Sequence, residues 1–181
     1  MSIEVYISEK EIEEKISELG KKISQDYAGE EIVIVCLLSG AFVFCADLVR
    51  KINVPVVLEF MKTSSYGSDT QSSGEVKIEL DLKKSVEGKN VVIVEDIVDT
   101  GLTVREIYHQ LILKKPFTLD ICTLLYKKVN CKVADLNIKY ICKEIEDKFV
   151  IGYGLDYDNL GRNYDTIYSL IEDEMGWDEL G

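Results

Sequence analysis

The stretch with the most evident chemistry lies near the middle of the chain, at residues 91–103. Its first four residues are β-branched and apolar, which predicts a strand buried on both faces of a parallel sheet. Two adjacent acids, Glu95 and Asp96, follow this strand, and a third acid, Asp99, comes three residues later. The next residues are Thr100, Gly101, Leu102 and Thr103, after which the apolar spacing becomes helical. The loop therefore lies at the carboxyl end of a predicted strand, where open α/β sheets bind ligands.

The residue types in this loop suit a phosphorylated sugar. The backbone N–H groups of residues 99–103 lead into a helix N-terminus, which favours a phosphate, and Thr100 and Thr103 add hydroxyl donors. Carboxylates beside a phosphate repel it unless they bind something else, and both sugar hydroxyls and Mg²⁺ fit them. The simpler interpretation is a capped helix after a buried strand, with solvated acids. Two acids directly on the end of a core strand are costly, however, which favours a binding role.

Strands and helices alternate on both sides of this loop. A capping-box pattern at residues 8–11 predicts the start of a helix, and apolar residues then recur along one helix face. The sequence predicts a helix at 41–52, a half-exposed strand at 76–80, and core strands at 32–38, 56–61, 119–125 and 138–142. This alternation predicts an α/β fold with a parallel sheet.

A long polar segment, residues 63–74, separates two of the predicted strands. Its composition alone favours a disordered surface loop. A long polar loop inside a compact domain is also typical of a lid that closes over an active site. The residues by themselves leave both interpretations open.

Length and charge restrict the class of protein. A chain of 181 residues predicts a single domain that covers residues 1–181. The formal net charge of −12 argues against nucleic acid and against an anionic membrane as partners. The N-terminus lacks the basic and apolar regions of a signal peptide, and no apolar run has the length of a transmembrane helix.

The five cysteines indicate a reducing compartment. They show no C-x-x-C spacing, which favours buried free thiols in a cytoplasmic protein; they are Cys36, Cys45, Cys122, Cys131 and Cys142. A zinc site is not expected from a single histidine, His109, which falls on the surface of a predicted helix.

The stretch from Glu95 to Thr103 resembles the binding motif for phosphoribosyl diphosphate (PRPP) in type I phosphoribosyltransferases. Its amino-acid sequence is most similar to that of the hypoxanthine-guanine phosphoribosyltransferases, and the resemblance extends over about residues 32–162. The resemblance implies a type I phosphoribosyltransferase fold, with a central, mainly parallel five-stranded sheet flanked by helices. A small hood would come from the N-terminal segment and from about residues 126–181.

The resemblance also implies an activity. A cytoplasmic purine-salvage enzyme of this family transfers the 5-phosphoribosyl group from PRPP to hypoxanthine or guanine. The products are IMP or GMP and pyrophosphate. Mg²⁺ is the implied cofactor, and a homo-oligomer, either a dimer or a tetramer, is the implied assembly.

On the PRPP side, the resemblance assigns the 5′-phosphate to the loop of residues 99–103. Glu95 and Asp96 match acids that face the ribose hydroxyls, directly or through Mg²⁺, and Asp156 matches a further acid bound to Mg²⁺. Pyrophosphate contacts are implied for Ser39, Gly40 and Arg162.

On the base side, Asp99 matches the general acid/base at the purine N7 and is the implied catalytic residue. Lys127 matches the donor to the 6-oxo group, whereas the residues alone favour a solvated lysine. Phe149 matches the aromatic ring that stacks on the purine, with core packing as the alternative. Val150 and Asp156 complete the implied purine site.

Two further segments have implied roles. Residues Ser64, Ser65, Tyr66 and Gly67 are similar to the mobile loop that closes over the reacting centre in this family. Ser39 stands where many members have lysine. Because the resemblance implies a cis peptide bond between Leu38 and Ser39, we expect backbone N–H groups rather than a side-chain charge to bind pyrophosphate here.

Two other functions stay open. One is an enzyme that prefers xanthine or guanine. The other is a regulatory nucleotide-binding protein on the same fold, such as one that binds RNA. The net charge of −12 weighs against RNA binding.

Overall fold

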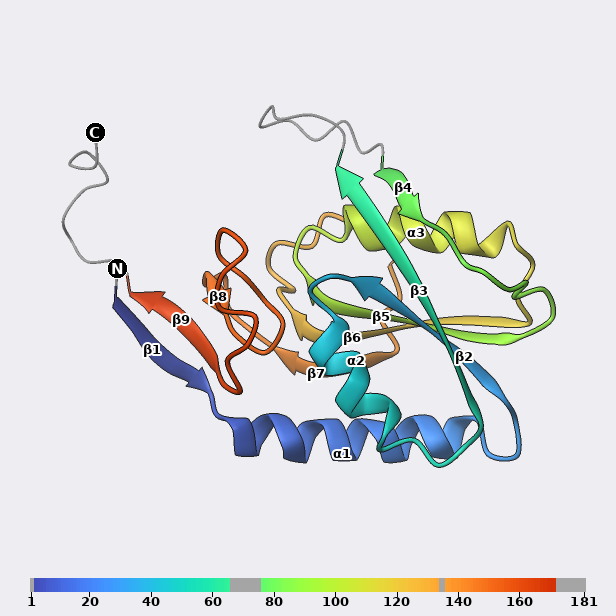
Figure 1. The fold of residues 1–181 in the computed structure, drawn as a ribbon, viewed down its shortest axis with the longest axis horizontal. Helices are drawn as coiled ribbons and strands as arrows, with labels where there is room; N and C mark the ends of the chain where they lie inside the picture. The colour runs from blue at the N-terminus through green and yellow to red at the C-terminus, as the bar shows by residue number, and fades with distance from the viewer. Residues whose placement is uncertain (1, 66–75, 134–135, 172–181) are drawn as a thin grey trace.

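The structure is a computed structural model that describes residues 2–65, 76–133 and 136–171. Its centre is a six-stranded sheet in the order β4-β3-β2-β5-β6-β7 (Figure 1). In chain order these strands are β2 (Ile32–Leu38), β3 (Val56–Ser65), β4 (Val76–Leu80), β5 (Asn90–Val98), β6 (Thr118–Tyr126) and β7 (Tyr140–Glu144). Five of them are parallel, and β4 pairs antiparallel with the β3 edge. The expected parallel core of five strands is therefore present, and β4 adds a sixth strand.

Helices cover both faces of the sheet, as Figure 1 shows. Helices α1 (Glu9–Asp26) and α2 (Phe42–Val49) pack on one face, and α3 (Leu102–Ile112) packs on the other. The central strands β2 and β5 contribute side chains to both apolar clusters, which is why their sequences are continuous apolar runs. The Ser8 hydroxyl accepts a hydrogen bond from the Glu11 N–H at 3.3 Å, so the predicted cap of α1 is confirmed.

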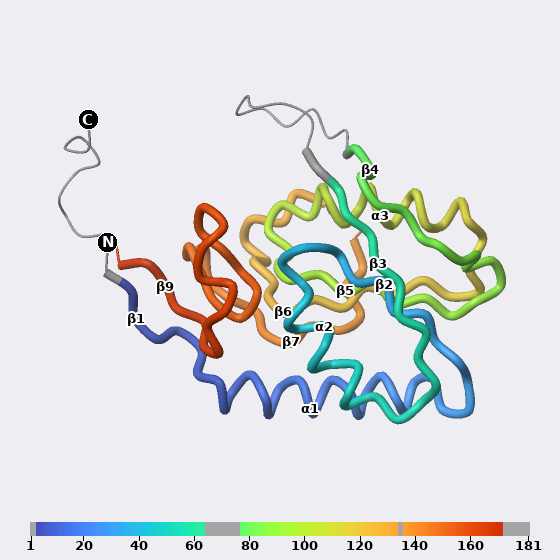
Figure 2. Tube along the Cα trace, viewed as in Figure 1, coloured from blue at the N-terminus to red at the C-terminus, as the bar shows by residue number. Residues whose placement is uncertain are grey.

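A second, three-stranded sheet is formed by segments from both ends of the chain. Its strands are β1 (Ser2–Ile7), β8 (Val150–Ile151) and β9 (Ile167–Ile171), in the order β1-β9-β8. Strands β1 and β9 run side by side and antiparallel, away from the main sheet (Figure 2). This small sheet corresponds to the expected hood, although β7, which lies within the expected hood range, pairs in the main sheet.

Several predicted boundaries differ from the structure for one reason, strand pairing. Strand β5 continues through Glu95 and Asp96 to Val98 because its ladder with β6 continues to the pair Val98–Tyr126. Strand β3 continues from the predicted end at Met61 to Ser65 because β4 pairs with it there. The strands β1 and β9 were not predicted as strands, since their partners are distant in sequence.

Other sequence-based expectations are also tested by the fold. All five cysteines are free, and four of them are buried, with Cys131 half-buried. His109 is exposed on α3, as expected. None of the helices in the described parts of the chain is long and apolar enough to cross a membrane.

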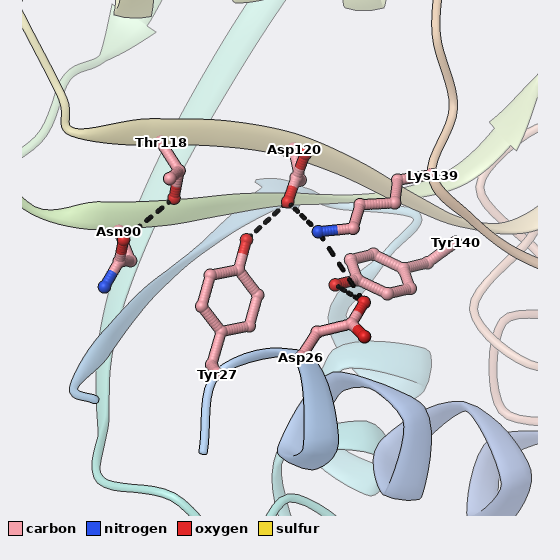
Figure 3. A network of polar contacts seen from close by, with 7 residues as sticks. All are labelled: Asp26, Tyr27, Asn90, Thr118, Asp120, Lys139 and Tyr140. Atoms are coloured by element: carbon pink, nitrogen blue, oxygen red, sulfur yellow. Dashed lines mark hydrogen bonds and ion pairs between the residues drawn. The ribbon is translucent and has the colours of Figure 1, made fainter. Parts of the chain in front are cut away.

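A cluster of polar side chains joins the end of α1 to strands β6 and β7 (Figure 3). Asp120 of β6 accepts hydrogen bonds from the Tyr27 hydroxyl and from Lys139 Nζ, the latter at 2.7 Å. Asp26 accepts a hydrogen bond from the buried Tyr140 hydroxyl at 2.7 Å. Burial and hydrogen bonds to these acids raise the pKa of Tyr27 and of Tyr140, so both hydroxyls remain donors. The cluster therefore ties α1 to the sheet.

The substitution Tyr27→Phe tests this tie. It removes the donor to Asp120 while leaving the ring in place, and we expect the free energy of unfolding to fall by about 2 kcal/mol because hydrogen bonds to charged groups are worth about that much. Urea unfolding of the two proteins measures the change. Tyr108→Phe in α3, where the ring packs edge-on against His109, is the matched control. An equal effect of the two substitutions would contradict a specific role for the Tyr27 hydroxyl.

Candidate active site

The candidate site lies at the carboxyl ends of β2, β5 and β6. After β2 the chain continues to β3 on one side, whereas β5 continues to β6 on the other side. The neighbouring strands β2 and β5 are thus the point at which the order of the strands reverses. Ligands of open α/β sheets bind in the crevice at such a point. The loops after β2 and β5, at residues 39–41 and 99–101, border that crevice.

The turn after β2 lies directly against the acids of β5. The peptide bond between Leu38 and Ser39 is cis, as expected. A Cβ atom added to Gly40 would lie 1.5 Å from Asp96 Oδ2, so any side chain at this position would displace the Asp96 carboxylate or the turn. From the other side, a Cβ atom on Gly154 would lie 2.3 Å from the Gly40 carbonyl oxygen. The turn is therefore enclosed between β5 and the segment that follows β8.

Glu95 and Asp96 are held by the backbone of β5. Glu95 Oε1 accepts a hydrogen bond from the Asp96 N–H at 3.0 Å, and Asp96 Oδ1 accepts one from the Ile97 N–H at 2.7 Å. Burial, together with repulsion from Asp96, raises the pKa of Glu95 well above its usual range. Burial also raises the pKa of Asp96, although the hydrogen bond with Glu95 and the charge of Arg162 oppose this shift. The pair is electrostatically unfavourable without a cation or a set of hydroxyl donors.

The loop after β5 presents backbone donors. Gly101 adopts a left-handed conformation, φ 81°, and precedes α3 as its N-cap. Within the described part of the chain, the N–H groups of Thr100 and Thr103 donate to no acceptor. The Thr100 carbonyl oxygen accepts a hydrogen bond from the Lys132 N–H at 2.9 Å, which ties the loop to the segment after β6. A helix N-terminus with free donors is suited to an anion such as phosphate.

Asp99 lies at the centre of a group of polar side chains. Lys127, at the end of β6, is almost fully buried, and its Nζ lies 3.4 Å from Asp99 Oδ2. The same Nζ lies 3.1 Å from Asp147 Oδ1. Asn130 Nδ2 donates a hydrogen bond to Asp99 Oδ1 at 2.9 Å. Lys127 is thus not the solvated lysine that the residues alone favour.

The segment that begins with β8 supplies the remaining expected residues. Phe149, just before β8, is 49% exposed and forms a T-shaped contact with Tyr157, with ring centroids 5.5 Å apart. Val150 is buried in β8 and pairs with Ser169. Arg162 donates to the Gly154 carbonyl oxygen at 2.7 Å and forms an ion pair of 2.7 Å with Asp156.

The structure brings most, but not all, of the expected residues together. Lys127 adjoins Asp99, and Gly40 adjoins Asp96. Asp156 is paired with Arg162, and across residues 2–65, 76–133 and 136–171 no three acidic, histidine or cysteine side chains form a group that could hold a metal ion. Glu95, Asp96 and Asp156 therefore do not form one three-ligand group in the described parts of the chain.

Two residues of the expected mobile loop lie within the described parts of the chain. Ser64 and Ser65 are the last residues of β3, paired with Lys77 and Val76. Tyr66 and Gly67 lie outside the described residues, as does the rest of the polar segment to residue 74.

Sequence reasoning missed three residues of the site. Asn130 and Asp147 lie in short polar segments that carry no motif, and only their contacts with Asp99 and Lys127 reveal them. Gly154 is one of two glycines that flank Tyr153, and the close approach to Gly40 explains it. Of the three residues, only Gly154 had a signal in the sequence, namely the pair of glycines around Tyr153.

Known proteins resemble this chain in sequence and in fold. The family model of the phosphoribosyl transferase domain matches residues 5–158. A hypoxanthine-guanine phosphoribosyltransferase of Aquifex aeolicus is 46% identical over 172 residues, which are 94% of this chain and 96% of that protein. One of Dictyostelium discoideum is 49% identical over 161 residues, 87% of this chain and 89% of that protein. The crystal structure of a hypoxanthine-guanine phosphoribosyltransferase from Bacillus anthracis has a TM-score of 0.89 at 42% identity, covering 93% of this chain and 98% of that chain.

The raised pKa of Glu95 predicts how stability depends on pH. In the folded, ligand-free protein Glu95 binds its proton more tightly than in the unfolded chain, so stability falls as pH rises from the unfolded value near 4.5 through the folded one. The substitution Glu95→Gln removes this titration. We expect it to raise the free energy of unfolding at pH 8, because a neutral amide avoids the cost of ionising this carboxyl group in the folded protein.

Urea unfolding between pH 5 and 8, in a metal chelator, measures this difference. Glu146→Gln is the control, because Glu146 is an exposed acid near the site. Equal pH dependence in wild-type protein and Glu95→Gln would show that Glu95 does not carry the effect.

Proposed function

Because the chain belongs to the phosphoribosyltransferase family, we propose that it transfers the 5-phosphoribosyl group of PRPP to hypoxanthine, and also to guanine. The products are IMP or GMP and pyrophosphate, and the protein is a pentosyltransferase of purine salvage. The observation that carries this proposal is the contact between Lys127 Nζ and Asp99 Oδ2, at 3.4 Å, beside a loop with free N–H donors. A 6-oxopurine presents N7 and O6 next to each other on one edge. An acid and a lysine at this separation suit that edge.

The roles of the residues follow from the contacts. Lys127 donates to O6, and Asp99 accepts the proton of the purine N7 as the base attacks the sugar. Phe149 stacks on the base with its exposed face, and the backbone of Val150 meets the edge of the ring. The loop of residues 99–103 binds the 5′-phosphate through its backbone N–H groups.

Glu95 and Asp96 accept hydrogen bonds from the ribose hydroxyls or hold Mg²⁺. Their donor chemistry fits this ion, since Mg²⁺ is bound in proteins by one or two carboxylates together with substrate phosphates. When bound, Mg²⁺ supplies positive charge to the pyrophosphate leaving group. Asp156, paired with Arg162, is a ligand only if that ion pair opens.

The pyrophosphate site combines backbone and side-chain donors. Ser39 and Gly40 offer the N–H groups of their turn, and Arg162 offers its guanidinium. The chain carries a net charge of −12, so these local donors must offset an unfavourable overall field. The role of residues 64–67 in excluding water from the oxocarbenium-like sugar is proposed from the sequence alone, because Tyr66 and Gly67 lie outside the described residues.

The proposal extends to compartment and assembly. Five free cysteines suit a reducing cytoplasm. Phe42, Leu58 and Phe60 expose between 40% and 45% of their surface on α2 and β3, which supports a homo-oligomer, a dimer or a tetramer. Sedimentation equilibrium tests the assembly, and a monomer at micromolar concentration would contradict it.

An assay with PRPP, Mg²⁺ and a panel of bases tests the function. We expect transfer to hypoxanthine and guanine, with kcat/KM for adenine lower by roughly 10²-fold or more, because the Lys127 ammonium cannot accept from an exocyclic amine. Xanthine and uracil complete the panel and test the alternative specificities. Equal efficiency with adenine and hypoxanthine would show that Lys127 does not read O6.

The substitution Asp99→Asn tests the general acid/base. The amide keeps the shape of the side chain but cannot take the N7 proton, so we expect kcat to fall by about 10²–10⁴-fold while the KM for PRPP changes little. Steady-state kinetics with hypoxanthine measure both constants. An unchanged kcat would remove Asp99 from this role.

The pair Gly40→Ala and Ser39→Ala tests the pyrophosphate turn. A Cβ atom on Gly40 would overlap the Asp96 carboxylate, so the turn or the carboxylate must move, and displacements of this size cost up to about 10²-fold in activity. Ser39 is exposed, and its replacement should leave activity and pyrophosphate affinity nearly unchanged. Product-inhibition constants for pyrophosphate measure the effect, and the opposite ranking of the two variants would refute it.

A further inference from the structure

Four side chains on the base side of the site form a ring of polar groups. Lys127 Nζ lies 3.4 Å from Asp99 Oδ2 and 3.1 Å from Asp147 Oδ1. Asn130 donates to Asp99 Oδ1 at 2.9 Å, and Asn130 also contributes to lowering the pKa of Asp147. Two cationic or amide donors therefore alternate with two carboxylates around the ring.

The backbone holds this ring rigidly. The Asn130 N–H donates to the Lys127 carbonyl oxygen at 3.0 Å, which closes a tight turn, and the Lys127 N–H donates to the Val98 carbonyl oxygen at 2.9 Å. The Ile145 N–H donates to the Tyr126 carbonyl oxygen at 2.9 Å, so the segment that carries Asp147 is also tied to the end of β6. Asn130 and Asp147 thus belong to segments fixed to the strands that carry Asp99 and Lys127.

A count of the donors and acceptors in the ring shows which groups remain for a ligand. A lysine ammonium has three N–H groups. Two of those of Lys127 face Asp99 and Asp147, which leaves one for a ligand. Asp99 has one oxygen occupied by Asn130, whereas the other meets only the long contact to Lys127 in the described structure. The ring therefore leaves one N–H group of Lys127 and one lone pair of Asp99 Oδ2 free, side by side.

Asp147 also limits the ion pair between Lys127 and Asp99. Lys127 Nζ is nearer to Asp147 than to Asp99, so its charge is shared. Without Asp147, the buried ammonium would have Asp99 as its one carboxylate partner among the described residues and would be drawn toward it. Asp99 Oδ2 would then be occupied when the purine binds. Hydrogen bonds from Asn130 and Lys127 lower the pKa of Asp147, so it is an anion at neutral pH.

We propose that Asn130 and Asp147 are positioning residues for the transfer reaction: Asn130 orients the Asp99 carboxylate toward N7, and Asp147 holds the Lys127 ammonium for O6. Neither residue touches the base; each acts through the residue that does. The inference rests on the proposed function, and it predicts that the two residues affect different kinetic constants.

The experiment compares Asp147→Ala and Asn130→Ala with wild-type protein. We expect Asp147→Ala to raise the KM for hypoxanthine roughly tenfold and to reduce the preference for hypoxanthine over adenine by a similar factor, because the base must then draw the Lys127 ammonium back from Asp99. We expect Asn130→Ala to lower kcat roughly tenfold with an unchanged KM for PRPP, because a misplaced base slows proton transfer. Asp147→Asn, which keeps an acceptor oxygen, should fall between wild-type protein and Asp147→Ala.

Controls separate positioning from folding. Glu146 is the exposed neighbour of Asp147, and its contact with Lys148 is long, at 3.9 Å. The substitution Glu146→Ala should leave all kinetic constants unchanged. Thermal melting of each variant shows whether it is folded. If a variant with alanine unfolds, Asp147→Asn and Asn130→Ser are measured in its place and must show the same division of effects.

Three results would overturn the inference, and they differ in what they say about the proposed function. Active wild-type protein with variants that match Glu146→Ala overturns the inference and leaves the proposed function intact. A fall in kcat together with a rise in the KM for both substrates, in both variants, also overturns it, because a general structural defect has that signature. Wild-type protein without transfer to any 6-oxopurine overturns the proposed function and this inference with it.

Discussion

The parallel pairing of β5 with β2 on one side and with β6 on the other is the constraint on which the whole site depends. Each strand of a parallel sheet ends at the same edge, so the two ladders bring three loops together. Asp96 meets Gly40 across the first ladder, and Asp99 meets Lys127 across the second. The continuous apolar runs of the central strands, buried on both faces, make this register hard to change.

Electrostatics oppose the placement of these acids. A chain with a net charge of −12 buries two adjacent carboxylates at the edge of its core, and the pKa of both is raised. Such an arrangement costs stability in the ligand-free protein and becomes favourable when hydroxyl groups or a divalent cation meet the carboxylates. Backbone N–H groups complete the balance, because they provide positive dipoles without any added side-chain charge.

The amino ends of the strands carry contacts that stabilise the fold, whereas the carboxyl ends carry the candidate site. At the amino ends of the strands, Asp26, Tyr27, Asp120 and Tyr140 form satisfied hydrogen bonds that connect α1 with β6 and β7 (Figure 3). At the carboxyl ends, the groups are partly unsatisfied or shared, as in the ring around Lys127. A rigid, well-bonded end supports an end whose donors and acceptors are left for a ligand.

The sequence by itself determined the elements whose patterns are local. The runs at residues 32–38 and 91–94, and the helical spacing after Thr103, predicted the core strands β2 and β5 and the loop between β5 and α3 correctly. Only the tertiary structure decided how far β3 and β5 extend, that β1 pairs with β9, that Asp156 binds Arg162, and that Asn130 and Asp147 reach Asp99 and Lys127. The reason is physical: periodicity and loop chemistry act over a few residues, whereas strand extension and side-chain pairing depend on partners that are distant along the chain.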